Sequence, residues 1–171
     1  MRARGVEVVA PAAVSQHLDV PAITPEILGA LQHEGRPIIL DVGGDEQGAR
    51  ALGQYSLTLR QRGYAMYLVV NPYRPFTADT AGIRDAIAQI ERTSRLLVTG
   101  FVSNPNLLAD TTVERFLAGQ RVMEAASRQL RMPIVFTAIE QRLWSRLAGA
   151  LAPDMPVLPL ERFFVMPWAE A

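Results

Sequence analysis

The chain has 171 residues, which is long enough for one domain with a sizeable buried core. Its formal net charge is zero, so it lacks the basic excess that marks many nucleic-acid-binding proteins. It has no cysteine and no lysine, which excludes disulfides, thiolate catalysis, Schiff-base chemistry and a phosphate-binding loop with its own lysine.

No apolar run approaches the roughly 20 residues of a membrane-spanning helix, and the first residues lack the apolar region of a signal peptide. We therefore expect no membrane span, no nucleic-acid partner and a cytoplasmic location. We also expect a single α/β domain over residues 1–171, with residues 153–171 as an extended C-terminal arm. Prolines interrupt that arm too often for a long helix.

The first predicted elements are a short strand and a helix. Residues 6–10 alternate weakly in polarity and are followed by a proline, which indicates a short strand that enters a loop. Thr24 and Pro25 are typical of the N-cap and first position of a helix, which we expect to end near Gly35.

The next stretch combines a strand, an acidic residue and a glycine turn. Ile38–Leu40 is a short apolar run that predicts a buried strand, and Asp41 follows it directly. Gly43 and Gly44 allow a turn with positive φ, and a helix from about Gln47 to Arg62 comes next. Open α/β sheets build ligand sites at such strand ends. The alternative is a tight turn in which Asp41 only caps nearby amides.

Further strands and helices alternate along the rest of the chain. Apolar runs predict strands at 66–71, 96–102 and 133–137, and helical spacing predicts helices near 83–90, 111–130 and 139–151. Thr111 and Glu114 have the spacing of a capping box. Continuously apolar strands that alternate with helices indicate a mostly parallel sheet with helices on both faces.

Polar side chains follow several of these predicted strands. They are Asp41, Asn71, Arg74, Asn104 and Asn106. Because parallel strands end at the same edge of a sheet, we expect these side chains to converge on a binding site. The alternative is that the asparagines and the aspartate form turns and that the arginine lies on the surface.

Four loop motifs, taken together, resemble a known family. They are Asp41-Val-Gly-Gly-Asp45, Asn71-Pro-Tyr-Arg-Pro-Phe-Thr77, Thr99-Gly followed by Asn104-Pro-Asn106, and Glu114 through Gly119-Gln120. In this order they resemble the CobQ/CobB/MinD/ParA-type nucleotide-binding proteins, and more narrowly an uncharacterised bacterial ATP-binding branch of that P-loop superclass. The resemblance extends from about Gly5 to Trp168.

The resemblance implies a P-loop NTPase-like fold, a truncated Rossmann-like three-layer sandwich, with ATP and Mg²⁺ as cofactors. It gives Asp41 the catalytic, magnesium-side role, with the metal held through water, and places Gly43 and Gly44 opposite the terminal phosphate. Asn71, Arg74, Asn104 and Asn106 become cofactor-binding residues, with Asn104 at the nucleotide base.

The chain also departs from this family. Members open with a strand, a lysine-bearing phosphate loop and a helix, and here the chain begins just before the segment that follows that unit. We therefore expect Ile38–Leu40 to lack a neighbouring strand, the chain to self-associate or bind a partner polypeptide, and ATP binding to be weak or absent for the chain alone. The resemblance suggests an ATPase, and the missing lysine leaves that activity open. The alternative is a degenerate scaffold that acts as a protein-interaction module without nucleotide.

Overall fold

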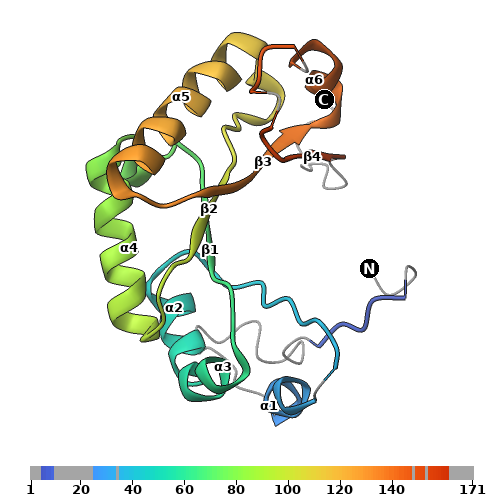
Figure 1. Ribbon diagram of the computed structural model, residues 1–171, viewed down its shortest axis with the longest axis vertical. Coiled ribbons are helices and arrows are strands. Elements are labelled where there is room, and N and C mark those ends of the chain that lie inside the picture. The colour runs from blue at the N-terminus through green and yellow to red at the C-terminus, as the bar shows by residue number, and fades with distance from the viewer. Residues whose placement is uncertain (1–4, 10–24, 34, 148, 153, 162–171) are drawn as a thin grey trace, which may run out of the picture. The chain divides into compact units, whose positions relative to one another are not determined.

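The computed structural model describes residues 5–9, 25–33, 35–147, 149–152 and 154–161. The chain forms two compact units (Figure 1). Unit 1 comprises Met1–Tyr64 and Gln89–Leu97, and unit 2 comprises Ala65–Ala88 and Val98–Ala171. The single domain stays a prediction.

A four-stranded parallel sheet forms the centre of unit 2. Its strands are β1 (Tyr67–Val70), β2 (Gly100–Ser103), β3 (Ile134–Glu140) and β4 (Val157–Leu160). They lie in the order β1-β2-β3-β4, and each neighbouring pair is parallel. The predicted α/β class with a parallel sheet is therefore confirmed, and three of the four strands lie where apolar runs predicted strands.

The strand order places the connecting helices of this unit on one face. The helices are α4 (Thr80–Ser94), α5 (Val113–Leu130) and α6 (Gln141–Leu147), with short 3₁₀ turns η3 (Pro75–Thr77) and η4 (Leu108–Asp110). Because each strand pairs with the next one along the chain, right-handed crossovers bring successive helices to the same side. Two of these helices contact the strands that they connect or adjoin: α5 packs on β2 and β3, and α6 packs on β3 and β4.

The two faces of the sheet differ in exposure. Val70, Ser103 and Thr137 share one face through the strand register and are fully buried. On the opposite face, Val69 of β1 is 60% exposed and Leu158 of β4 is 46% exposed. Helices on both faces therefore stay a prediction.

An apolar cluster joins α5, α6 and β3. It consists of the buried side chains Phe116, Ile139, Leu143 and Leu147, and partly buried neighbours such as Trp144 and Val157 surround it. Burial of this size stabilises unit 2, because each fully buried side chain of this kind contributes about 1.5–3 kcal/mol.

Strand β4 lies within the segment that the sequence predicted to be an arm. Its residues Val157–Leu160 pair with Thr137–Glu140 of β3, so this part of the segment belongs to the sheet. Pro159 argued against a strand here, since proline lacks the N–H that a central strand needs. In the strand order β4 is terminal, where a proline can face the unpaired side. The rest of the predicted arm, at 153 and 162–171, lies outside the described residues.

Unit 1 contains the helices α1 (Pro25–Gln32), α2 (Glu46–Gly53) and α3 (Ser56–Arg62), together with the last turns of α4. Both strands predicted in this unit are wrong over the residues that the structure describes: 6–9 and Ile38–Leu40 have no regular structure. Ile39 is 94% exposed. An apolar run becomes a buried strand only when a neighbour pairs with its backbone, and Ile38–Leu40 has no such neighbour among the described residues.

Arginine contacts hold this irregular stretch instead. The guanidinium group of Arg62, at the end of α3, donates to the carbonyl oxygens of Leu31 (2.8 Å), His33 (2.6 Å) and Arg36 (2.7 Å). These bonds fix the chain between α1 and residue 36 against the end of α3.

The helix predicted from Gln47 to Arg62 is two helices, which are separated at Gln54 and Tyr55. Its predicted end is confirmed, because Gly63 follows α3 with φ of 80°. Burial raises the pKa of the Tyr55 side chain, and its hydroxyl group has no hydrogen-bond partner in the described part of the chain.

No described helix combines the length and the apolar composition that crossing a bilayer requires.

Candidate functional site

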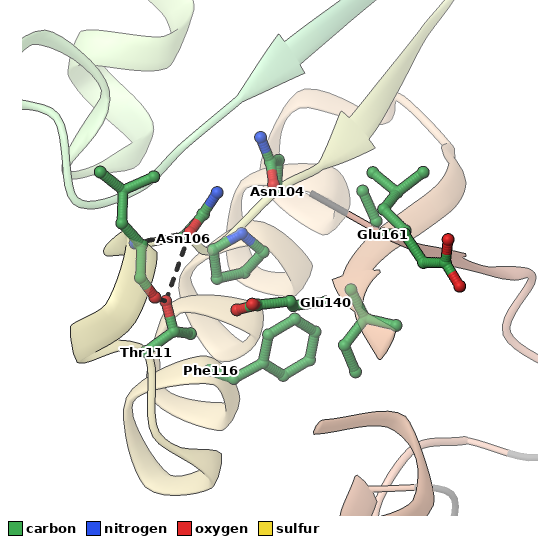
Figure 2. Close-up of a pocket in the computed structure, with 11 residues that line it drawn as sticks. Asn104, Asn106, Thr111, Phe116, Glu140 and Glu161 are labelled. Atoms are coloured by element: carbon green, nitrogen blue, oxygen red, sulfur yellow. Dashed lines mark hydrogen bonds between the residues drawn. The ribbon is translucent and has the colours of Figure 1, made fainter. Parts of the chain in front are cut away.

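Unit 2 has a pocket of about 240 Å³ at the carboxyl ends of β2, β3 and β4 (Figure 2). Its polar lining residues come from loops and strand ends: Asn104, Asn106, Thr111, Glu140 and Glu161. Its apolar lining residues are Pro105, Leu108, Phe116, Ala138, Ile139 and Leu160. This is the position at which open parallel sheets bind ligands.

Two residues predicted from the sequence, Asn104 and Asn106, line this pocket. The backbone N–H of Asn104 donates to the carbonyl oxygen of Val70 at 2.9 Å, which attaches the start of the loop to the end of β1. The side-chain Oδ1 of Asn106 accepts from the N–H of Leu108 at 2.7 Å and the hydroxyl of Thr111 at 3.3 Å. Among the described residues, the side-chain amide group of Asn104 and the Nδ2 group of Asn106 have no protein partner. Both groups are therefore available to a ligand.

Asn71 joins two loops of the same sheet edge. Its Nδ2 donates to the carbonyl oxygen of Asn106 at 2.7 Å. Its Oδ1 accepts from the backbone N–H groups of Tyr73 (3.1 Å) and Asn106 (3.3 Å). These three bonds use both the oxygen and the nitrogen of the amide, so Asn71 positions Asn106. Its predicted direct contact with a cofactor stays a prediction.

Arg74 lies in the loop that follows β1. Its backbone N–H donates to the carbonyl oxygen of Asn71 at 3.0 Å, and its side chain is exposed. The guanidinium group has no acidic partner among the described residues, and Arg74 does not line the pocket. Its predicted role in cofactor binding stays a prediction.

Glu140, which the sequence interpretation missed, is the last residue of β3. Its Oε2 lies 2.9 Å from Nε of Arg142. The Nη2 atom of Arg142 also donates to the carbonyl oxygens of Leu108 (3.1 Å), Ala109 (3.3 Å) and Thr111 (3.1 Å). Arg142 therefore fixes both the carboxylate of Glu140 and the 108–111 loop on the other side of the pocket.

The start of α5 differs by one residue from the predicted capping box. Thr112 is the N-cap, and its hydroxyl oxygen accepts from the N–H of Arg115 at 3.3 Å. Thr111 is buried and its hydroxyl group accepts from the N–H of Leu107 at 2.8 Å. The exposed Glu114 carboxyl accepts hydrogen bonds from the Glu114 backbone N–H and from the Thr112 hydroxyl, and these bonds lower its pKa. Because Thr112 caps the helix, the Thr111 side chain is not needed as the cap and lines the pocket instead.

The predicted phosphate and magnesium residues Asp41, Gly43 and Gly44 belong to unit 1. All three are exposed. Neither glycine has a positive φ, so the prediction of a positive-φ turn at Gly43 and Gly44 is wrong. The backbone of Gly48 lies close to the backbone of Gly43, and a Cβ added at Gly48 would collide with the carbonyl oxygen of Gly43. Asp45 caps α2 by accepting from the N–H of Gly48 at 2.8 Å, so this helix start already has an anion.

The lining of the pocket limits the groups that it could hold. No group of three histidine, aspartate or glutamate side chains is placed to hold a metal ion in the described ranges. The pocket lining has two carboxylates and no cationic residue, and one of the carboxylates, Glu140, is paired with Arg142, so the lining offers no cationic group to hold a phosphate. In the described residues the pocket therefore offers no set of ligands for Mg²⁺ and no cationic partner for a phosphate chain.

Comparison of the chain with protein-family models, curated proteins and solved structures finds no match.

Proposed function

We propose that this chain is a nucleotide-binding domain of the MinD/ParA type that supplies the base-binding part of the site. In this proposal the phosphate-binding lysine comes from outside these 171 residues, since the chain has none. ATP with Mg²⁺ is the nucleotide that the sequence resemblance implies. Hydrolysis is not expected from this chain alone.

The observation that supports the proposal is the pocket at the carboxyl edge of the parallel sheet. It combines the side-chain amide of Asn104 and the Nδ2 group of Asn106 with apolar walls. Ligand pockets of proteins typically combine a mostly apolar lining with a few placed polar groups. Asn104 is also the residue that the resemblance assigns to the base.

Calorimetry with Mg–ATP and Mg–GTP tests this function. For the unmodified chain we expect dissociation constants in the millimolar range or weaker, equivalent to about 4 kcal/mol at best. A chimera that carries a lysine-bearing loop unit from a MinD/ParA-type protein should bind one of the two in the micromolar range, because loop amides and lysine hold the phosphates.

Two variants of the chimera serve as controls. Replacement of the grafted lysine by alanine and Asn104→Ala should each weaken binding. Micromolar binding by the unmodified chain would show that one of its own arginines holds the phosphates. A correctly folded chimera that binds neither nucleotide would contradict the proposed function.

The second candidate is a protein-interaction module, and the exposed edge strand β1 favours it. Tyr67 and Val69 of this strand are 45% and 60% exposed, and β1 has no partner strand on its outer side in the described residues. Unpaired strand edges promote association between chains.

On this basis we expect sedimentation velocity to detect concentration-dependent self-association of the unmodified chain. Val69→Lys should weaken it, because a charge on an edge strand opposes pairing. The exposed Leu57→Lys change in α3 is the matched control, since Leu57 is 69% exposed and lies outside the sheet. A monomer at all concentrations would contradict this expectation.

A further inference from the structure

Leu108, in the loop on one side of the pocket, has a backbone conformation that leucine rarely adopts. Its φ is 55°, in the left-handed region, where a Cβ crowds the following carbonyl oxygen. Two other described residues that are not glycine have a positive φ, Arg95 and Arg131. They directly follow α4 and α5, where helices commonly end in a left-handed residue. Leu108 is instead the first residue of η4, so the end of a helix does not explain its conformation.

Three hydrogen bonds hold the backbone of Leu108 in this conformation. Its N–H donates to Oδ1 of Asn106 at 2.7 Å. Its carbonyl oxygen accepts from the N–H of Thr111 at 3.1 Å and from Nη2 of Arg142 at 3.1 Å. Figure 2 shows Asn106 and Thr111 next to each other on one wall of the pocket. A strained backbone persists only where its surroundings determine it, and such residues cluster at ligand-binding sites.

The side chain of Leu108 keeps apolar surface that a ligand in the pocket would cover. Leu108 lines the pocket and is 44% exposed, whereas Phe116 of the same lining is 1% exposed. The side-chain amide of Asn104 and the Nδ2 group of Asn106 belong to the same lining. An aliphatic side chain beside free amide groups suits a flat ring that has an apolar face and a polar edge.

We infer that Leu108 is a ligand-contact residue, which packs on the face of the nucleotide base while the two amide groups bond to its edge. The inference deepens the proposed function and rests on it. The strained backbone places the side chain at the pocket, and burial of that side chain by the base favours binding. Leu108 thus stabilises the complex and destabilises the free protein.

Two substitutions at Leu108 separate the contact from the strain. Leu108→Ala and Leu108→Gly both remove the apolar contact, so each should lower the affinity for ATP about 5- to 10-fold. Glycine adopts a positive φ freely, whereas alanine keeps the Cβ that causes the strain. We therefore expect Leu108→Gly to melt about 2–4 °C above Leu108→Ala.

The matched control is Arg131→Gly at the end of α5. Arg131 has a φ of 52°, is exposed and does not line the pocket. Its replacement relieves the same kind of strain and should leave the affinity for ATP unchanged. Thermal unfolding followed by circular dichroism gives the melting temperatures, and NMR titration of each chain with ATP and with adenosine gives the affinities. Because the contact is with the base, the loss in the Leu108 variants should be the same for both ligands.

Each other outcome has a distinct meaning. Unchanged affinity in both Leu108 variants, or a loss that occurs with ATP and not with adenosine, overturns the contact with the base and leaves nucleotide binding in place. A melting temperature of Leu108→Gly at or below that of Leu108→Ala overturns the strain on which the inference depends. Absence of saturable shifts for the unmodified chain with both ligands overturns the proposed function, and the inference with it.

Discussion

Phe116→Ala is expected to reduce the free energy of unfolding of unit 2 by about 3–5 kcal/mol. The Phe116 side chain is 1% exposed and packs against Ile139, Leu143 and Leu147, so its removal leaves a cavity in the main apolar cluster. The ring also lines the pocket, so the variant should lose ligand binding as well. Urea denaturation followed by tryptophan fluorescence measures the change, because Trp144 packs against this cluster.

The matched control for this substitution is Phe76→Ala. Phe76 is 85% exposed, so the same loss of atoms should change the free energy of unfolding by no more than about 0.5 kcal/mol. Equal effects of the two substitutions, or a loss below about 1 kcal/mol for Phe116→Ala, would contradict the packing described for α5.

Gly119→Ala is expected to destabilise unit 2 by about 1–3 kcal/mol, although alanine is the better helix former. An added Cβ would lie 2.7 Å from Cβ of Pro105, 3.0 Å from Cγ of Pro72 and 3.1 Å from Cε2 of Tyr73. Proline rings cannot rotate away, so α5 would have to move off the loops that follow β1 and β2. The same loops carry Asn71, Asn104 and Asn106, and ligand binding should weaken together with stability.

The control for this helix glycine is Gly29→Ala in α1. An added Cβ there meets no atom within 4 Å, so the change should stabilise the protein by about 0.5–1 kcal/mol through helix propensity alone. Thermal unfolding followed by circular dichroism compares the two variants. A melting temperature of Gly119→Ala at or above that of the parent chain would show that α5 does not lie against these loops.

The sequence predicts the parallel core of unit 2 because its strands and helices carry strong local signals. The apolar runs become β1 to β3, and the stripe of Ile83 and Ile87 becomes the buried side of α4. Ile38–Leu40 carries an equally strong signal and forms no strand, since pairing depends on a neighbour that local pattern does not encode. Pro159 has the opposite effect and conceals a real edge strand.

The candidate site was predicted in part. Asn104 and Asn106 follow an evident strand, and they line the pocket. Glu140 was missed because Ile139 has helical spacing to Leu143 and Leu147, which moved the expected end of the strand back to Thr137. An acidic residue at the end of a strand is a usable signal only where the strand forms, as at Glu140 and not at Asp41. The contact of Arg142 with the 108–111 loop could not be predicted, since the carbonyl groups that accept from it lie more than 30 residues away in the sequence.

The most direct measurement of nucleotide binding by this pocket is an NMR map of the unmodified chain with ATP. The side-chain amide signals of Asn104 and Asn106 and the backbone signals of Ala138–Glu140 should shift together and saturate with one millimolar-range dissociation constant. Saturable shifts confined to other parts of the chain, such as β1 or the glycine turn near Asp41, would contradict the assignment of the base to this pocket.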